Sequence, residues 1–276
     1  MADITGPGDI IAPLFVPGDR PERFVKAAQS GCDAVIVDLE DAVAPASKER
    51  ARAGAEAGFT DLPVLLRING IGTPWHEADM AVALRKGFAG IVVPKAESNE
   101  AFAALCSRAA AAEVPIVALV ETATGVADAR RLAAMPQVAR IAFGSIDFSA
   151  DIGCAHEREA LHYARSELVI ASRAGGKPAA LDGVTTSVDD IALVRDDARY
   201  ARALGMRGKL CIHPKQIAAV REGFLPDAGE VAWAKKILSI DDAGAASVDG
   251  AMVDEPVRKR AAQILHLVKT VAQREV

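Results

Sequence analysis

The 276-residue chain has few cysteines and no long apolar segment, and each shortage excludes a class of protein. The 4 cysteines lie far apart and form no Cys-x-x-Cys pair, so neither a disulfide framework nor a zinc knuckle is expected. No apolar segment approaches the roughly 20 residues that span a bilayer, and the first residues lack the basic and apolar parts of a secretory signal. The sequence therefore predicts a cytoplasmic protein with no membrane partner.

The chain also has fewer basic than acidic residues. The chain has 32 lysines and arginines against 37 acidic residues, a net charge of -5, and no long basic run. Nucleic acid is therefore not expected as a partner. The sequence contains neither a Gly-x-Gly-x-x-Gly fingerprint nor a phosphate-binding loop motif, which removes the simplest nicotinamide and nucleotide interpretations.

Short apolar segments alternate with longer stretches rich in alanine, leucine, arginine and glutamate along most of the chain. This alternation is typical of βα units around a parallel sheet, and continuous apolar strands indicate burial on both faces. About eight strands are expected, the number that closes a TIM barrel, and an open doubly wound sheet is the alternative. The expected strands are Ile10–Val16, Ala34–Asp38, Val64–Ile68, Gly90–Pro94, Ile116–Val120, Arg140–Phe143, Pro178–Leu181 and Lys209–Ile212.

The predicted architecture is an α/β TIM (β/α)8 barrel with a C-terminal helical extension. The barrel, as the catalytic domain, is expected over residues 8–225 and the extension over residues 226–276. In the extension, helical segments are joined by the Gly/Ala/Ser-rich stretch Ala243–Gly250, so it could pack on its own barrel or cross to a neighbouring subunit. The expected helices are Arg23–Ser30, Lys48–Ala57, Ala78–Lys86, Glu100–Ala112, Ala127–Ala133, Arg158–Ala174, Ile191–Leu204, Pro214–Arg221, Glu230–Ser239 and Pro256–Gln273.

Two carboxylates follow apolar strands directly, at the end of a barrel where chemistry takes place. Glu121 comes after Ile116–Val120, and Asp147 comes shortly after the next strand, so both are expected at one mouth. Hard oxygen ligands with room for water and substrate favour magnesium, with manganese as the usual substitute. The alternative for either residue alone is capping of the following helix.

Arg67 lies within an apolar strand, where a guanidinium is costly unless a carboxylate meets it. Its planar fork suits bidentate binding of a substrate carboxylate, or stabilisation of an enolate oxygen beside the metal. The alternative is an internal salt bridge with Asp38 or Glu40.

Other polar residues follow the remaining strands. Asp38, Glu40 and Asp41 could supply metal ligands directly or hold metal-bound waters. Arg20 belongs to a small basic edge that could meet the phosphates of a coenzyme-A thioester, although an ordinary solvated helix face explains such spacing as well. His213 is either a base that titrates near neutrality or a structural residue before a helix-opening proline.

Seven stretches, in order along the chain, resemble the citrate lyase β-subunit-like branch of the HpcH/HpaI aldolase superfamily. They are Leu14–Arg20, Asp38–Val43, Leu66–Asn69, Val120–Ala123, Phe143–Phe148, Gly208–Gln216 and Gly250–Asp254. The resemblance implies a TIM barrel that holds magnesium through Glu121 and Asp147, with Arg67 on the substrate's carboxylate or carbonyl oxygens. It also implies assembly as a homo-trimer or hexamer, in which Asp254 enters a neighbouring subunit's site and transfers a proton.

The expected activity is that of a magnesium-dependent carbon–carbon lyase or Claisen-type condensing enzyme. It would act on a β-hydroxyacyl thioester such as malyl-, citramalyl- or citryl-coenzyme A and release or use a 2-oxo acid. One alternative is a malyl-coenzyme A thioesterase that uses the same metal site. An alternative of another class is a non-catalytic scaffold subunit of a lyase complex.

Overall fold

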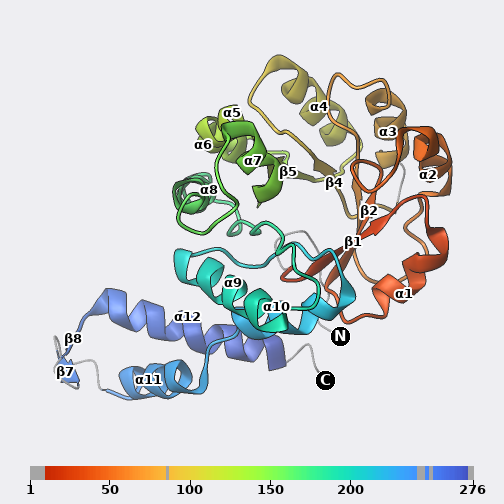
Figure 1. The fold of residues 1–276 in the computed structure, drawn as a ribbon. Coiled ribbons are helices and arrows are strands. Elements are labelled where there is room, and N and C mark those ends of the chain that lie inside the picture. Colours follow the sequence, from red (N-terminus) through yellow and green to blue (C-terminus); the bar gives the residue numbers. More distant parts are fainter. Residues whose placement is uncertain (1–9, 85–86, 241–245, 249–250, 273–276) are drawn as a thin grey trace. The chain divides into compact units, whose positions relative to one another are not determined.

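The computed structural model describes residues 10–84, 87–240, 246–248 and 251–272. The chain divides into two compact units, one ending at Phe224 and the other beginning at Leu225. Figure 1 shows both units, which are described separately below. Among the described residues, no helix combines the length and the apolar character that crossing a membrane requires.

The first unit is built on a parallel sheet whose strands follow one another in chain order. Successive strands pair in register, for example Leu14 with Val35 and Val37 with Leu66. The six strands are β1 (Pro13–Pro17), β2 (Ala34–Asp38), β3 (Val64–Arg67), β4 (Gly90–Val93), β5 (Ile116–Val120) and β6 (Val138–Phe143). They agree with the first six predicted strands to within a few residues at their ends.

Two shorter segments close the sheet into a ring. Leu181 bridges to Ala142 of β6, Asp182 bridges to Lys209, and Cys211 bridges to Leu14 of β1, all in parallel. Hydrogen bonds support the closure, with Phe143 N donating to Leu181 O at 2.9 Å. The unit is therefore a (β/α)8 barrel, which confirms the predicted fold. The seventh and eighth predicted strands are reduced to these bridges, so their predicted lengths were too long.

The strands are continuous apolar runs in the sequence because both of their faces are buried. Ala34 and Ile36 of β2 face the barrel interior with residues such as Leu119, while Val35 and Val37 pack outward against the helices. Both faces of each strand are thus buried, as expected for a parallel barrel.

The helices surround the strands, as Figure 1 shows. They are α1 (Phe24–Ala28), α2 (Lys48–Gly54), α3 (His76–Ala83), α4 (Glu100–Ala111), α5 (Ala123–Ala127), α6 (Ala129–Ala134), α7 (Ser145–Ile152), α8 (His162–Ala174), α9 (Ile191–Leu204) and α10 (Ile217–Phe224), with short 3-10 turns at Pro21–Arg23, Pro45–Ser47 and Pro214–Gln216. The helix α7 was not expected from the sequence; it begins one residue after β6 and carries Asp147 in its first turn.

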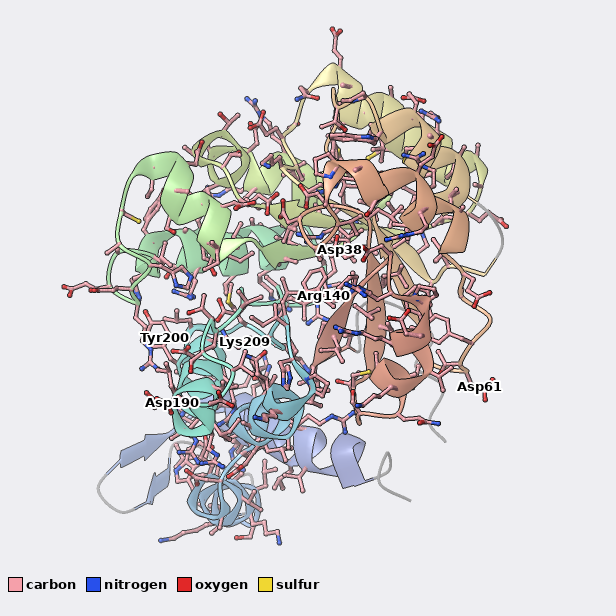
Figure 2. All side chains as sticks on the ribbon, turned by 45° about the vertical axis from the view of Figure 1, so that its right-hand side comes forward. Asp38, Asp61, Arg140, Asp190, Tyr200 and Lys209 are labelled. Carbon is pink, nitrogen blue, oxygen red and sulfur yellow. The ribbon has the colours of Figure 1, made fainter. Side chains whose placement is uncertain are left out.

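Buried charges hold the closing segments of the barrel. The carboxylate of Asp182 accepts hydrogen bonds from Arg165 Nε at 2.7 Å and from Lys209 Nζ at 2.8 Å, and all three side chains are buried. Arg140 is also fully buried and donates to the carbonyl oxygens of Ala179 and Ile10. Arg140 and Lys209 lie inside the barrel unit, whereas the exposed Asp61 lies at its outer edge (Figure 2).

The second unit consists of α11 (Ala228–Leu238), a two-stranded antiparallel pair of β7 (Ala246–Val248) and β8 (Ala251–Val253), and α12 (Glu255–Ala272). Ala234 and Ile237 of α11 pack with Ala261 and Ile264 of α12 in a small apolar cluster. The stretch Ala243–Gly250, expected to be flexible, contains β7, and its other residues lie outside the described part of the chain.

Candidate active site

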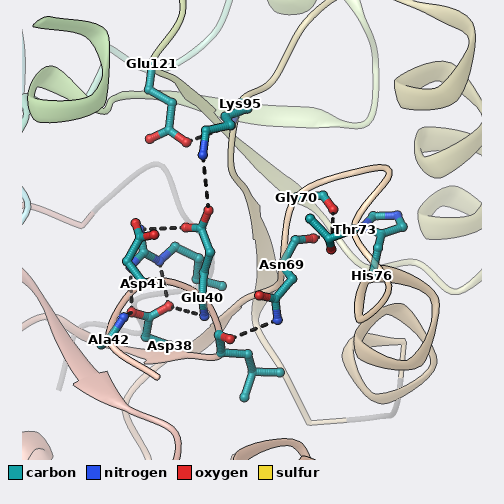
Figure 3. Close-up of polar contacts among 12 residues, drawn as sticks. Asp38, Glu40, Asp41, Ala42, Asn69, Gly70, Thr73, His76, Lys95 and Glu121 are labelled. Atoms are coloured by element: carbon teal, nitrogen blue, oxygen red, sulfur yellow. Dashed lines mark hydrogen bonds and ion pairs between the residues drawn. The ribbon is translucent and has the colours of Figure 1, made fainter. Parts of the chain in front are cut away.

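The C-terminal ends of β2 to β6 bring acidic and basic side chains to one mouth of the barrel. Side chains alternate along a strand, so Asp38 and Arg67, which follow inward-facing Ile36 and Leu65, point toward the barrel axis. Glu121 continues β5 in the same way after Leu119. Figure 3 shows Glu121, Lys95, Glu40 and Asp38 following one another across this mouth.

Arg67 is held by three carboxylates. Its Nε and Nη2 bind the two oxygens of Asp38 at 2.7 and 2.5 Å. Its Nη1 lies 3.0 Å from Glu40 Oε2 and 3.4 Å from Asp41 Oδ2. The ring of Phe15 lies beneath, with its centroid 4.7 Å from the guanidinium carbon. The internal salt bridge that the sequence left open as an alternative is therefore present, and it fixes the guanidinium beside the mouth.

Glu40 is buried in an acidic surrounding. Its pKa is raised to about 7, chiefly by burial; Arg67 opposes this rise, Asp41 and Asp38 add to it, and Lys95 opposes it slightly. A carboxyl group with this pKa is partly protonated at neutral pH. Glu40 can therefore hold or release a proton next to Arg67.

Glu121 is 2% exposed and has little to balance its charge. Its Oε1 accepts a hydrogen bond from the backbone N–H of Lys95 at 2.9 Å. Burial raises its pKa to about 8, with further contributions from the charges of Glu40 and Asp147. Gly144 lies so close that a Cβ atom on it would collide with Glu121 Oε2. The glycine thus leaves just enough room for this carboxylate.

Asp147 lies in the first turn of α7 and is partly exposed. Its charge contributes to the raised pKa of Glu121, which places the two carboxylates within electrostatic reach of each other. Neither acts as a helix cap in the described part of the chain: Thr122, not Glu121, accepts from Gly125 N at the start of α5, and α7 has no side-chain cap. The capping alternative therefore does not account for the pair.

This pair fits a hard divalent cation. Both ligands offer carboxylate oxygen, and their mutual repulsion in a buried site is relieved by positive charge. Within the described residues, no group of three or more histidine, cysteine or acidic side chains is arranged to hold a metal. The protein would supply two carboxylates and leave the other positions to water and substrate oxygens, which is how magnesium is commonly bound.

Lys95 connects the pair to the rest of the mouth. Its φ of +48° places it in the left-handed region, which is uncommon for a residue with a side chain. This conformation directs its N–H to Glu121, while its ammonium lies 3.9 Å from Glu40 Oε1. Burial lowers the pKa of Lys95, but Glu40, Glu121 and Asp147 raise it more, so the net pKa is above its ordinary value and the ammonium stays charged.

A cavity of about 540 Å³ opens beside these groups. It is lined by the loops that follow β2, β3, β4 and β5, including Glu40, Asn69, Lys95 and Thr122. Its volume suits a small organic ligand.

Buried Asp79 holds one wall of the cavity in place. It accepts from the backbone N of Asn69 at 2.9 Å, from Asn69 Nδ2 at 2.5 Å and from Arg52 Nε at 2.6 Å. His76 adds a contact between its Nδ1 and the carbonyl oxygen of Asn69 at 2.9 Å. The loop after β3 is therefore fixed before a ligand arrives.

Comparison with known proteins agrees with this geometry. The model of the HpcH/HpaI aldolase/citrate lyase family matches residues 12–214. The chain belongs to this family.

Several relatives cover nearly the whole chain. A citrate lyase subunit beta-like protein of Deinococcus radiodurans is 38% identical over 273 residues, which cover 91% of this chain and 95% of that protein. An L-malyl-CoA/beta-methylmalyl-CoA lyase of Rhodobacter capsulatus is 32% identical over 283 residues, covering 87% and 89%. The crystal structure of CitE from Mycobacterium tuberculosis with magnesium, acetoacetate and coenzyme A superposes with a TM-score of 0.82 at 33% identity, covering 94% and 97%.

For three further predicted residues the structure shows local contacts or none. Arg20 is exposed after β1, and within the described residues its side chain makes no ion pair or hydrogen bond. His213 accepts from Lys215 N at 3.2 Å at the start of a 3-10 turn, which is the structural alternative. Asp254 belongs to the second unit, where its Oδ1 accepts from Val257 N at 3.1 Å at the start of α12. The catalytic role of Asp254 stays a prediction.

Two residues that shape the site, Lys95 and Asp79, were given no role in the sequence analysis. Lys95 stands after β4 in the sequence, but its left-handed backbone and its hydrogen bond to Glu121 depend on the neighbouring strand. Asp79 lies within α3 and gives no sequence signal of its contact with Asn69. The position of Lys95 directly after the fourth predicted strand does draw attention to it, but gives no sign of these contacts.

Proposed function

We propose that this protein is a magnesium-dependent carbon–carbon lyase, or Claisen-type condensing enzyme, that acts on a β-hydroxyacyl-coenzyme A thioester and releases or uses a 2-oxo acid. The observation that carries the proposal is the pair Glu121 and Asp147. The pair lies at the mouth of a family barrel, makes no capping hydrogen bond, and includes a buried carboxylate whose pKa is raised to about 8. Named relatives with this chemistry support it.

The residues divide the work as follows. Glu121 and Asp147 would hold magnesium, with manganese as a substitute, and the bound ion would supply the positive charge that stabilises a developing oxyanion. Arg67 donates hydrogen bonds to the oxygen that gains or loses negative charge at the carbonyl. Asp38, Glu40 and Asp41 hold Arg67 in place and would also hold waters bound to the metal.

In the cleavage direction, the β-hydroxyl group loses its proton and becomes the carbonyl of the 2-oxo acid. The Cα–Cβ bond breaks, its electron pair forms the enolate of the thioester, and a proton is then delivered to the α-carbon. Asp254 is the residue proposed for this proton transfer, supplied from a neighbouring subunit of a homo-trimer or hexamer. Arg20 is proposed to meet the phosphates of coenzyme A.

The expected ligands are therefore a 2-oxo acid and an acyl-coenzyme A thioester. Solved structures of the related CitE contain coenzyme A, acetoacetate, pyruvate or oxaloacetate together with magnesium. A cytoplasmic location stays a prediction from the sequence.

The test is incubation of the purified protein with malyl-, citramalyl-, citryl- and hydroxymethylglutaryl-coenzyme A, with magnesium or with excess chelator. Free thiol and 2-oxo acid are both measured. A 2-oxo acid formed only with magnesium, together with an intact product thioester, is the expected result. Free thiol with an unbroken acid would make the protein a thioesterase, and no turnover with any thioester would contradict the proposal.

A further inference from the structure

We infer that Lys95 binds a second carboxylate of the substrate, remote from the metal, so that this protein prefers a dicarboxylic 2-oxo acid unit over a monocarboxylic one. The inference rests on the proposed function, because it takes Glu121 and Asp147 as the site where the first carboxylate and the carbonyl oxygen are bound. It adds a residue that selects among the substrates of that site.

The position of Lys95 is the first argument. Its backbone N–H touches Glu121, and its side chain lines the 540 Å³ cavity, so one residue joins the carboxylate pair to the open space beside it. A ligand anchored at Glu121 and Asp147 that extends into the cavity passes along this side chain. Figure 3 shows the ammonium between Glu121 and Glu40.

The second argument is that the other cations near the cavity are already bound to groups of the protein. All the outer nitrogens of Arg67 face the carboxylates of Asp38, Glu40 and Asp41. Lys48, which also lines the cavity, is buried and donates to the carbonyl oxygens of Leu39 and Glu40 at 2.8 and 2.7 Å.

Lys95 differs from both. Its side chain is 53% exposed, and in the described part of the chain its ammonium makes one ion pair, at 3.9 Å, and no hydrogen bond. At that distance the ion pair is loose, and all three N–H donors are available to an incoming anion. Among the described cations that line the cavity, Lys95 is thus the one ready to bind a ligand.

The backbone supplies the third argument. A non-glycine residue in the left-handed region is unfavourable and persists where the surrounding structure holds it. Here the Glu121 hydrogen bond and the Ala96 N–H donating to Leu119 O at 3.1 Å hold the turn on both sides of the strand end. The direction in which Lys95 leaves the strand is therefore fixed by the same contact that orients Glu121.

The short path between Glu121 and the ammonium decides which anion fits. Glu121 accepts from the backbone N–H of Lys95, and the ammonium lies at the end of that same residue's side chain, so an anion that reaches it from the metal pair must be separated from the pair by only a few bonds. The second carboxylate of a dicarboxylic 2-oxo acid meets this condition. The phosphates of coenzyme A do not, because the long pantetheine arm separates them from the thioester.

Oxaloacetate and pyruvate are the probes, since they differ by one carboxylate. Their affinities are measured by titration calorimetry in saturating magnesium for the wild type and for Lys95→Met, Lys95→Arg and Lys177→Met. Lys177 is a matched control because its Nζ contacts the carbonyl oxygen of Met135, away from the cavity lining. Coenzyme A affinity and the thermal midpoint are measured for the same four proteins.

We expect the wild type and Lys177→Met to bind oxaloacetate at least about tenfold more tightly than pyruvate, and Lys95→Met to reduce this ratio to within about twofold. Lys95→Arg should keep most of the preference because it keeps the charge. A wild type that binds both acids equally, or a Lys95→Met protein that keeps the ratio, would overturn the inference alone. A loss of coenzyme A affinity with an unchanged ratio would overturn it in favour of a phosphate. Failure of the wild type to bind either acid would overturn the proposed function as well.

Discussion

Two acidic regions of the barrel differ in how their charge is balanced. Asp182, on a segment that closes the ring, is buried against two cations at 2.7 and 2.8 Å. Burial raises the pKa of Asp182, but Lys209 and Arg165 lower it more, so the net pKa is below its ordinary value. Glu121, directly after β5, is equally buried but receives one backbone N–H, and burial raises its pKa to about 8.

The difference fits a structural role for Asp182 and the ligand-binding role proposed for Glu121. A buried carboxylate that its neighbours neutralise contributes to the closure of the fold and has nothing left to offer a ligand. A buried carboxylate without such partners is costly to the empty protein, and such groups are concentrated at functional sites, where a ligand can supply the missing charge. In this barrel the first kind lies where the strands are shortest, and the second lies where the strands are regular and a cavity opens.

The largest effect should come from Glu121→Gln. The amide can still accept the hydrogen bond from Lys95 N–H, but it removes a negative ligand, so magnesium-dependent turnover should fall by about a thousandfold or more. Glu167→Gln is the matched control, since Glu167 pairs with Arg130 on the outer surface. Steady-state kinetics with varied magnesium and a thermal melt check both variants. Retained turnover in Glu121→Gln would remove the metal role of this residue.

The structural region is tested by Asp182→Asn. Loss of the carboxylate leaves Lys209 and Arg165 buried without a counter-charge, and we expect a loss of about 3 to 5 kcal/mol in the free energy of unfolding. Urea denaturation monitored by circular dichroism measures it. A loss below about 1 kcal/mol would show that the network does not stabilise the closure of the barrel.

The space around Glu121 is tested by Gly144→Ala. The added methyl group collides with Glu121 Oε2, so the carboxylate must move, and magnesium affinity should fall by about tenfold. Gly175→Ala is the control, because its methyl group would lie 2.6 Å from the backbone oxygen of Ala133 at the end of α8. That change should lower the thermal midpoint and leave manganese binding, measured by electron paramagnetic resonance, unaltered. Equal manganese affinities in the two variants would contradict the expectation.

The smallest effect is the pH dependence of stability, which should have opposite signs in the two regions. Glu40 and Glu121 have folded pKa values of about 7 and 8 against an ordinary value of 4.5. Their contribution is therefore fully present below pH 4.5 and is lost as the pH rises through 7 and 8. Asp182 has a lowered pKa, so its contribution is present above its ordinary value of 3.8 and is lost as the pH falls through the folded value.

Thermal melts of metal-free protein between pH 5 and 9 measure the first dependence. The midpoint should fall with rising pH, and magnesium should raise it more at pH 8.5 than at pH 6, because the ion binds the ionised carboxylates. Glu121→Gln should flatten the curve. A midpoint in the metal-free wild type that rises over this range would contradict the assigned pKa shifts.

Much of the barrel was predictable because its signals are local. Apolar strands such as Ala34–Asp38 and Ile116–Val120 were predicted with the observed ends, since burial on both faces leaves an uninterrupted apolar run. The seventh and eighth strands were predicted too long, and α5, α7 and the β7–β8 pair were missed. The ion pair between Asp182 and Lys209 could not be predicted either, because it joins residues 27 positions apart in the sequence.

The sequence by itself determined the βα order, the barrel, and the placement of Arg67, Glu121 and Asp147 at or shortly after strand ends, because strand periodicity and the position after a strand are properties of neighbouring residues. Only the tertiary structure decided which buried carboxylates are neutralised by neighbouring cations and which are not. That outcome depends on which side chains meet across different strands, as Asp38 meets Arg67 and as Lys95 meets Glu121. Charge compensation depends on the distances between side chains in space, and the sequence does not give these distances for residues far apart along the chain.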